Sequence, residues 1–444
     1  MKFFRRVSGL TAVVVALLAR AASAAPQAAA TGDISWMLMA TALVILMTPA
    51  LAFFYGGLVR PKNALNTMMM SFVSLGFVGV CWCVVGYSLA FGEGNAVIGD
   101  FSRVFLNGVT TESGEGIPEL LFMAFQGTFV IITAALISGA LVERMRFGPY
   151  IAFISIWSLV VYAPIAHWVW GGGWLAGTFT TLDFAGGTVV HINAAAAAVV
   201  GALVLGPRKD YGRQALLPHN VPFVLLGAGL LWFGWFGFNG GSALAANGTA
   251  VLALTNTMLA PAGTLVVWTL LDHFRSRQIT AVGTATGIVV GLVAVTPASG
   301  FVSPMSALAI GAIAALPSYF VIIWRAKTRL DDSLDVMAAH GIGGTVGALL
   351  TGFFAAAAWG GTDGLFYGNA VQPLIQLLGV VATIVYSAGV TFVLLKIINQ
   401  FAPLRADVRM EGIGLDVSLH SEEAYTHGEG AVLLTEIELN GHRN

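Results

Sequence analysis

The sequence predicts an all-α polytopic membrane protein. Of its 444 residues, 57% are hydrophobic and only 10% are charged, whereas soluble domains carry about 25% charged residues. A soluble fold of this size could not bury so much apolar surface. Apolar stretches of bilayer-spanning length recur along the chain. The formal net charge of −1 provides no basic field, so we expect no nucleic-acid partner.

The first 24 residues have the pattern of a secretory signal peptide. Lys2, Arg5 and Arg6 precede a ten-residue apolar stretch that is too short to span a bilayer. The small residues Ala22-Ser23-Ala24 then match a cleavage site. We expect cleavage after Ala24 and a short periplasmic segment over residues 25–35, although an uncleaved amphipathic leader fits the same pattern.

Eleven later stretches each have enough apolar residues to form a transmembrane helix. They lie at residues 36–58, 64–91, 118–141, 148–169, 187–206, 221–238, 252–272, 281–296, 305–325, 337–357 and 372–399. Residues 36–399 are therefore predicted to form one transmembrane domain. The polar residues 400–444 are too few for an enzyme domain, and we expect them to form a tail.

Basic residues in the short loops predict the orientation of these helices. The loops after helices 1, 3, 5, 7 and 9 contain twelve Lys or Arg residues, against one, Arg103, in the alternate loops. The twelve are Arg60, Lys62, Arg144, Arg146, Arg208, Lys209, Arg213, Arg275, Arg277, Arg325, Lys327 and Arg329. Because Lys and Arg concentrate on the inner side, the N-terminus is predicted to be periplasmic and the tail cytoplasmic.

A weak internal repeat relates helices 1–5 to helices 6–10. Helix 1 ends in Phe54-Tyr55-Gly56-Gly57 and helix 6 in Phe238-Asn239-Gly240-Gly241, while helices 5 and 10 each have one central histidine. Two units of five helices must be inverted relative to one another, since five is odd. An inverted 5+5 repeat with a final eleventh helix places the substrate path at the repeat interface, near the midplane of the bilayer.

The two central histidines, His191 and His340, are the main ionisable groups predicted within the bilayer. Such groups are costly to bury and are usually functional. Imidazole can both donate and accept a hydrogen bond, which suits proton handling near neutral pH. The alternative is that each histidine simply hydrogen-bonds to a neighbouring helix.

Two aspartates begin predicted helices. Asp183, before helix 5, either caps free N–H groups or provides a carboxylate that supports an outer cation site, and the two roles are compatible. Asp335 begins helix 10, after Asp331 and Asp332. We expect Asp335 to cap this helix and to pair with Arg329.

Most of the 28 Phe and 11 Trp residues are expected to face lipid or the membrane interface. Phe129, Trp170, Trp235 and Phe238 differ because they lie beside glycines or polar residues. Together with the hydroxyl of Ser242, aromatic faces of this kind could hold a small cation by cation–π attraction and a hydrogen bond.

Several motifs carry a resemblance to a known family. They are Phe125-Gln126-Gly127-Thr128-Phe129, Ala166-His167-Trp168-Val169-Trp170-Gly171-Gly172-Gly173, Leu182-Asp183-Phe184-Ala185-Gly186-Gly187-Thr188-Val189-Val190-His191-Ile192-Asn193, Gly234-Trp235-Phe236-Gly237-Phe238-Asn239-Gly240-Gly241-Ser242, and Asp331-Asp332 through His340-Gly341. In these motifs the chain resembles the ammonium transporter (Amt/Rh) family, bacterial Amt branch. The likeness runs in order from about Trp36 to the tail.

The resemblance implies roles for individual residues. It implies an outer recruitment site at Phe129, Trp170 and Ser242, a stacked gate at Phe129 and Phe238, pore histidines His191 and His340 bordered by Trp235, a structural-electrostatic aspartate at Asp183, and an inner vestibule at Phe54 and Tyr55. The segments 411–420 and 423–425 are similar to the tail that couples Amt proteins to a cytoplasmic nitrogen-regulatory P-II protein. The family also implies a homotrimer with one pore per subunit.

The resemblance implies an ammonium transporter of the bacterial inner membrane rather than an enzyme, without a cofactor or metal. NH₄⁺, or methylammonium as an analogue, would be recruited outside and deprotonated. Ammonia would then cross a histidine-lined hydrophobic pore into the cytoplasm while the proton transfers separately. Only such a substrate can donate hydrogen bonds and lose a proton, so K⁺ is expected to be excluded by its desolvation cost.

Three other functions fit parts of the sequence. An Rh-like channel would pass neutral NH₃ or CO₂, but the aromatic cation site argues against it. A membrane redox enzyme would ligate haem through His191 and His340, yet the small residues 194–198 favour close helix packing over space for a macrocycle. An ammonium sensor would need a signalling domain, and no such domain follows helix 11.

Overall fold

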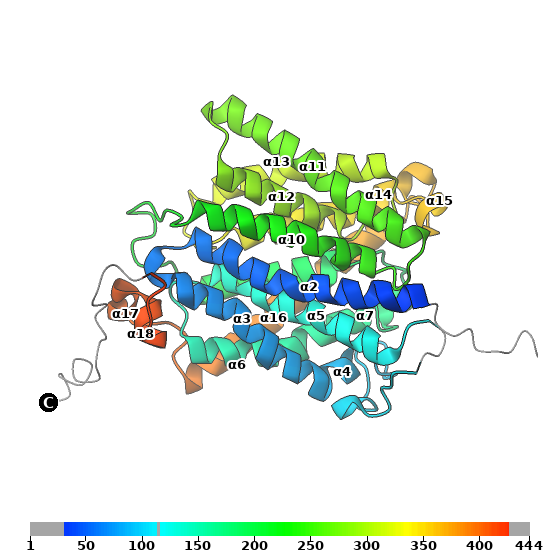
Figure 1. Cartoon of the computed structure of the whole chain (residues 1–444), viewed down its shortest axis with the longest axis horizontal. Coiled ribbons are helices and arrows are strands. Elements are labelled where there is room, and N and C mark those ends of the chain that lie inside the picture. Colours follow the sequence, from blue (N-terminus) through cyan, green and yellow to red (C-terminus); the bar gives the residue numbers. More distant parts are fainter. Residues whose placement is uncertain (1–30, 113–115, 426–444) are drawn as a thin grey trace, which may run out of the picture.

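The computed structural model describes residues 31–112 and 116–425 (Figure 1). The predicted signal peptide and residues 426–444 of the predicted tail lie outside this range. Over the described residues the protein is almost entirely helical, and its one isolated antiparallel bridge joins Met145 and Arg405.

The α-helices are α2 (Thr31–Leu58), α3 (Ala64–Cys81), α4 (Tyr87–Phe91), α5 (Glu119–Ile137), α6 (Phe147–Trp157), α7 (Ala163–Val169), α8 (Trp174–Gly177), α9 (Asn193–Leu205), α10 (Val221–Gly241), α11 (Gly248–Ser276), α12 (Ala281–Val295), α13 (Pro304–Arg325), α14 (Gly343–Phe354), α15 (Ala357–Gly360), α16 (Gln372–Phe401), α17 (Val408–Ile413) and α18 (Leu415–His420). Four π-helical turns adjoin them, namely η2 (Trp82–Gly86), η5 (Ser158–Tyr162), η6 (Gly187–Ile192) and η7 (Met337–Ile342). Short 3₁₀ turns cover Pro61–Asn63, Val104–Leu106, Ser138–Ala140 and Leu365–Tyr367.

The predicted all-α polytopic fold is confirmed. Ten continuous helical stretches in the described residues are long and apolar enough to cross a membrane, and α12 is a shorter apolar helix. These eleven coincide with the eleven predicted stretches. Several predicted ends were wrong. The first helix begins at Thr31, five residues before the predicted start, and the seventh spans Gly248–Ser276, four residues longer at each end than predicted. The sixth helix continues to Gly241, and the tenth stops at Phe354, where the chain becomes extended at Ala355.

Helices α2 and α10, which begin the two predicted repeats, lie side by side across the middle of the bundle (Figure 1). Glycines on α10 allow this approach. A Cβ atom at Gly227 would lie 2.4 Å from the backbone nitrogen of Phe54, and one at Gly237 would lie 2.6 Å from Leu43 Cβ. Small residues that bring backbones into contact are typical of packing between membrane helices.

The two ends of the bundle differ. The tail face carries α17 and α18, beside the end of α2 (Figure 1). Asp416 anchors this tail by accepting the backbone N–H groups of Leu65 and Asn66 at 3.0 and 2.7 Å. The opposite end, which we call the mouth face, contains the start of α2, where Trp36 donates to the carbonyl oxygen of Gly240 close to Ser242. Trp170, at the end of α7, belongs to the same end (Figure 1).

Buried ion pairs join the loops at the tail face. Arg208 donates to Glu143 at 2.8 Å and to both oxygens of Asp331 at 2.9 Å. Burial alone would raise the pKa of Glu143, but Arg208 and Arg60 hold this pKa below its ordinary value. Arg208 and Arg144 lower the pKa of Asp331 in the same way, again against burial.

The expectation for Asp335 was wrong. The carboxylate that caps the tenth helical stretch belongs to Asp332, which accepts the N–H groups of Val336 and Met337 at 3.1 and 2.6 Å. Asp335 instead has a positive φ of 59° and accepts from Arg325 Nε at 2.7 Å, not from Arg329. The sequence alone could not separate the two because the aspartates are only three residues apart.

Candidate functional site

A continuous series of aromatic and imidazole rings leads inward from the mouth face. The indole of Trp170 meets Phe129 edge-on, with ring centroids 6.0 Å apart. Phe129 stacks on Phe238 at 4.1 Å with an interplanar angle of 24°. Phe238 in turn lies 6.0 Å from the ring of His191. Helices α5 and α10 therefore place two buried phenylalanines between Trp170 and the first histidine.

The polar groups at the mouth are fixed by local hydrogen bonds. Ser242 follows α10, and its hydroxyl donates to the carbonyl oxygen of Phe238 at 2.8 Å. The indole N–H of Trp170 donates to the carbonyl oxygen of Asp183 at 2.9 Å. Trp170 and Ser242 are both partly exposed, whereas Phe129 and Phe238 are buried. Trp170 and Ser242 are thus reachable from the mouth face, but the passage beneath them is closed by the stacked rings of Phe129 and Phe238.

His191 and His340 contact one another at the centre of the bundle. Their Nδ1 atoms are 3.2 Å apart, and their rings are nearly parallel at an interplanar angle of 26°. Each lies in a π-helical turn, η6 or η7, that continues directly into an α-helix. A π turn inserts one extra residue into the helical period and is frequent at functional sites.

The contact between the Nδ1 atoms restricts the hydrogen positions of the pair. A neutral imidazole has one N–H donor and one acceptor nitrogen. One Nδ1 must therefore donate and the other accept, so one Nε2 keeps a lone pair while the other Nε2 carries a hydrogen. The pair consequently offers one proton acceptor and one donor to a small polar molecule.

The space around the histidine pair is narrow and apolar. Its cavity volume is about 10 Å³, close to the smallest volume that holds one water molecule. It is lined by Met47, Leu51, Phe54, Ile132, Leu136, Val190, His191, Leu231, Trp235, Phe238, Val289 and His340. Trp235 stacks on His191 at 5.3 Å, and its N–H is held by the hydroxyl of Thr296 at 2.9 Å.

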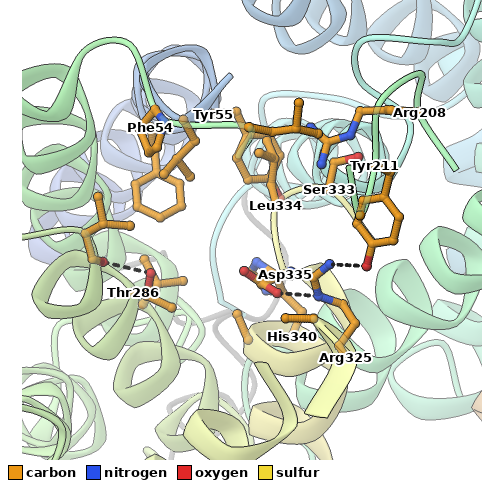
Figure 2. A pocket seen from close by; sticks show the side chains of 18 of the residues that line it. Phe54, Tyr55, Arg208, Tyr211, Thr286, Arg325, Ser333, Leu334, Asp335 and His340 are labelled. Carbon is orange, nitrogen blue, oxygen red and sulfur yellow. Dashed lines mark hydrogen bonds and ion pairs between the residues drawn. The ribbon is translucent and has the colours of Figure 1, made fainter. Parts of the chain in front are cut away.

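A wider vestibule of about 380 Å³ opens beyond His340 toward the tail face (Figure 2). Phe54 lines both the narrow cavity and this vestibule, and Tyr55 lines the vestibule. The ion pair between Asp335 and Arg325 lies on its wall (Figure 2). The structure therefore brings the predicted inner residues Phe54 and Tyr55 to the end opposite Trp170.

Asp183 lies outside the ring series and organises the start of η6. Its carboxylate accepts the backbone N–H groups of Gly186, Gly187 and Thr188 at 2.8, 2.6 and 2.8 Å, as well as the Thr188 hydroxyl. Burial raises the pKa of Asp183 above its ordinary value, although the hydrogen bonds from Thr188 and the glycines oppose this effect. Its expected capping role is present in this geometry.

Close contacts and backbone conformation require glycine at the two positions Gly186 and Gly187. Gly186 has a φ of 115° and would place a Cβ atom 2.6 Å from Val190 Cγ2, while one at Gly187 would lie 2.6 Å from Pro297 Cβ. L-residues rarely adopt such a positive φ. These two glycines therefore allow the chain to turn directly from Asp183 into η6.

Two contributors to this site were not predicted from the sequence. Thr296, which holds Trp235, follows α12 and has no distinguishing sequence context. Arg325 was counted only as a loop charge, yet it lines the vestibule. In the described part of the chain, no three His, Cys, Asp or Glu side chains gather in a way that could hold a metal ion.

Comparisons with known proteins cover nearly the whole chain. Residues 35–425 match the model of the Ammonium Transporter Family. The chain is 49% identical to an ammonium transporter of Aquifex aeolicus, over 95% of this chain and 99% of that protein. It is 47% identical to an ammonium transporter of Bacillus subtilis, over 89% and 98% of the two chains. The crystal structure of Saccharomyces cerevisiae Mep2 matches with a TM-score of 0.81 and 35% identity, covering 86% and 89%.

Proposed function

The chain belongs to the ammonium transporter family, and we propose that it takes NH₄⁺ at the mouth face, removes its proton, and passes ammonia along the histidine pair to the vestibule. The observation that carries this proposal is the 3.2 Å contact between the Nδ1 atoms of His191 and His340 inside an apolar cavity of about 10 Å³. A passage of this size and polarity suits one small neutral molecule that exchanges hydrogen bonds with imidazole.

Recruitment is proposed at Phe129, Trp170 and Ser242. A cation over an aromatic face gains about 0.5–2 kcal/mol, with the larger value at desolvated sites. The Ser242 hydroxyl already donates to the Phe238 carbonyl, so its oxygen lone pairs remain available to accept an N–H of ammonium. These groups attract a small cation that can donate hydrogen bonds.

Passage beyond this site is proposed to require loss of the proton. The stacked rings of Phe129 and Phe238 replace the water around the cation without providing an acceptor for its hydrogen bonds. Burying a charge without a partner costs far more than burying a neutral polar molecule. Ammonia therefore crosses more readily than NH₄⁺, whereas K⁺ has no proton to lose.

The histidine pair is proposed to serve both ammonia and the proton. An Nε2 lone pair can accept a hydrogen bond from ammonia, and the partner Nε2–H can donate one. A proton taken up by the free Nε2 lone pair would be balanced by transfer of the Nδ1 proton across the 3.2 Å contact and release of the partner's Nε2 proton, which would move charge separately from nitrogen. Trp235 borders this step by stacking on His191, and Phe54 and Tyr55 receive the product in the vestibule.

Asp183 is proposed to act on the cation indirectly. Its side chain holds the start of η6 and its carbonyl oxygen holds the Trp170 indole. The carboxylate therefore supports both the histidine-bearing turn and the recruitment site without belonging to the ring series.

We also propose a bacterial cell-membrane location with the mouth face outside and the tail inside. The basic loop residues of the tail face, such as Arg60 and Arg208, support this orientation. Cleavage after Ala24, assembly as a homotrimer, and regulation by a P-II protein through residues 400–444 belong to the same proposal. The docked segment from Glu411 to Tyr425 gives such a partner a site close to the vestibule.

The test is a rapid ammonium jump on proteoliposomes, recording current and internal pH for the wild type and His340→Ala. We expect a transient current in the wild type and a decrease of at least about 100-fold in the variant, the lower range for loss of acid–base catalysis. Internal alkalinisation without current would instead indicate a neutral NH₃ channel. The absence of both signals would favour a sensor and contradict transport.

A further inference from the structure

The side chain of Gln376, on α16, pairs with the backbone of Leu182 as a neighbouring strand would. Its Oε1 accepts the N–H of Leu182 at 2.8 Å, and its Nε2 donates to the carbonyl oxygen of Leu182 at 2.7 Å. Gln376 is fully buried. A buried amide in an otherwise apolar helix needs such partners, because an unpaired polar group costs about 1–3 kcal/mol.

The remaining hydrogen-bonding capacity of Gln376 is also used. Its Nε2 donates a second time, to the carbonyl oxygen of Ala348 at 3.0 Å, and its Oε1 accepts from Gln372 at 3.3 Å. Gly379, almost one turn further along α16, leaves space for the same loop. A Cβ atom at Gly379 would lie 2.9 Å from Thr181 Cγ2. The loop before Asp183 is therefore fixed along the first turns of α16.

This loop leads directly to the mouth site. Asp183 follows Leu182, and its carbonyl oxygen accepts the indole N–H of Trp170 at 2.9 Å. Ala348, the other partner of Gln376, lies in α14, which continues from the π turn of His340. One side chain thus joins the segment that precedes His191 to the helix that follows His340.

We propose that Gln376 is a positioning residue that sets the affinity of the mouth for ammonium by holding Leu182, and through Asp183 the indole of Trp170. This inference rests on the proposed function and assigns a residue of the final helix to it. Gln376 does not line the ring series, the narrow cavity or the vestibule. Its effect is exerted through the backbone of the loop.

The chemistry of the contact determines the informative variants. Gln376→Leu retains much of the side-chain volume but leaves the N–H and carbonyl of Leu182 and the carbonyl of Ala348 without this partner. In Gln376→Glu, an ionised carboxylate places an oxygen against the carbonyl oxygens of Leu182 and Ala348, which repel it. The protonated carboxyl has one O–H group and can donate to one of these two oxygens. Thr391→Val is the matched control. It removes another buried hydrogen bond of α16, from Trp157 at 3.0 Å, without contact to the loop.

The first experiment measures the half-saturating ammonium concentration for proteoliposome currents. We expect a rise of about fivefold to twentyfold in Gln376→Leu, a maximal current within about twofold of wild type, and little change in Thr391→Val. In a Trp170→Leu background, adding Gln376→Leu should change half-saturation by less than about twofold, because the indole it positions is already absent. Multiplication of the two single effects would overturn the proposal.

The pH dependence of Gln376→Glu provides a signature that a merely structural role would not produce. Acidification protonates the introduced carboxyl. The ratio of the half-saturating ammonium concentration of Gln376→Glu to that of the wild type should therefore approach one as pH is lowered. The same ratio for Gln376→Leu should not change with pH. Equal pH profiles for the two variants would overturn the proposal.

Amide hydrogen exchange keeps this inference separable from the transport mechanism. The N–H groups of residues 182–189 should exchange faster in Gln376→Leu than in the wild type or in Thr391→Val. Unchanged exchange would overturn the positioning role even if transport decreased. If the wild-type protein carried no ammonium-dependent signal, the proposed function would fail while faster exchange would still support the contact.

Discussion

The Nδ1 atoms of His191 and His340 lie 3.2 Å apart although 149 residues separate them in the chain. Each ring comes from a π-helical turn, in equivalent helices of the two predicted repeats. The contact requires one nitrogen to donate and the other to accept. The proton exchange and the hydrogen bonding to ammonia that we propose are therefore two uses of the same geometry.

An asparagine at position 340 should separate these two uses. The amide of Asn can hydrogen-bond near the position of the imidazole Nδ1, but it does not titrate. We expect His340→Asn to keep a stability close to wild type and to lose the ammonium current. His340→Ala should lose the current and also about 1–3 kcal/mol of stability, since His191 Nδ1 is left buried without this partner.

Currents in proteoliposomes and unfolding in detergent would check both parts of this prediction. His273→Ala is the control, because His273 lies on the exposed end of α11, away from the pair. A wild-type current in His340→Asn would show that transport needs only the hydrogen bond and no titrating group.

Removal of the Trp170 indole should weaken recruitment rather than conduction. A cation–π contribution of about 0.5–2 kcal/mol corresponds to a rise in half-saturating ammonium of roughly twofold to thirtyfold for Trp170→Leu. Trp324→Leu is the control. It removes an exposed tryptophan at the C-terminal end of α13 and should leave the half-saturating ammonium concentration unchanged. Concentration series of the current would measure both variants, and equal half-saturation in all three proteins would refute the recruitment site.

Arg208→Met should destabilise the protein strongly, because it breaks the buried ion pairs of the tail face. This change leaves the carboxylates of Glu143 and Asp331 without their shared cation, and breaking a buried pair in this way costs about 3–5 kcal/mol. Arg213→Met, at an exposed position, should be neutral. Thermal unfolding of the purified proteins distinguishes the two expectations, and equal unfolding temperatures would contradict them.

In the wild type, acid should remove the stability that Arg208 provides through its ion pairs with Glu143 and Asp331. Burial raises the pKa values of Glu143 and Asp331, but the charges and hydrogen bonds of their arginine partners, chiefly Arg208, lower them further than burial raises them. The folded-state pKa values are therefore below their ordinary values. A lowered pKa means that stability is present at neutral pH and is lost as pH falls below about 4 through the folded-state values. Unfolding measured from pH 7 to pH 3 should show that Arg208→Met loses less stability on acidification than the wild type does. An identical acid response would contradict this origin.

Docking of the tail should depend on pH with the opposite sign. Burial raises the pKa of Asp416 to about 6, against the lowering effect of the N–H groups of Asn66 and Leu65. A raised pKa favours the protonated, docked form. Docking is therefore strongest at acidic pH and weakens as pH rises through about 6.

Amide exchange in residues 415–420, corrected for the intrinsic rate, would detect this change between pH 5 and pH 7.5. We expect relatively faster exchange at the higher pH in the wild type and little pH dependence in Asp416→Asn. The same dependence in both proteins would exclude Asp416 as its source.

Hydropathy predicted the helices well because membrane spans need long apolar runs. The π turns at His191 and His340 were not predictable, since one inserted residue leaves the apolar composition unchanged. The roles of Asp332 and Asp335 depended on a positive φ that the sequence does not display. Gln376 did have a signal, as an amide four residues after Gln372 in an apolar helix, but its partner Leu182 is fixed only by tertiary packing.

Deprotonation of the cation before it crosses can be tested by comparing K⁺ with ammonium. Wild-type proteoliposomes would receive equal jumps of either salt while the current is recorded. We predict a transient current for ammonium and none above protein-free liposomes for K⁺, because only ammonium can leave its charge as a proton. A K⁺ current approaching that of ammonium would contradict the account.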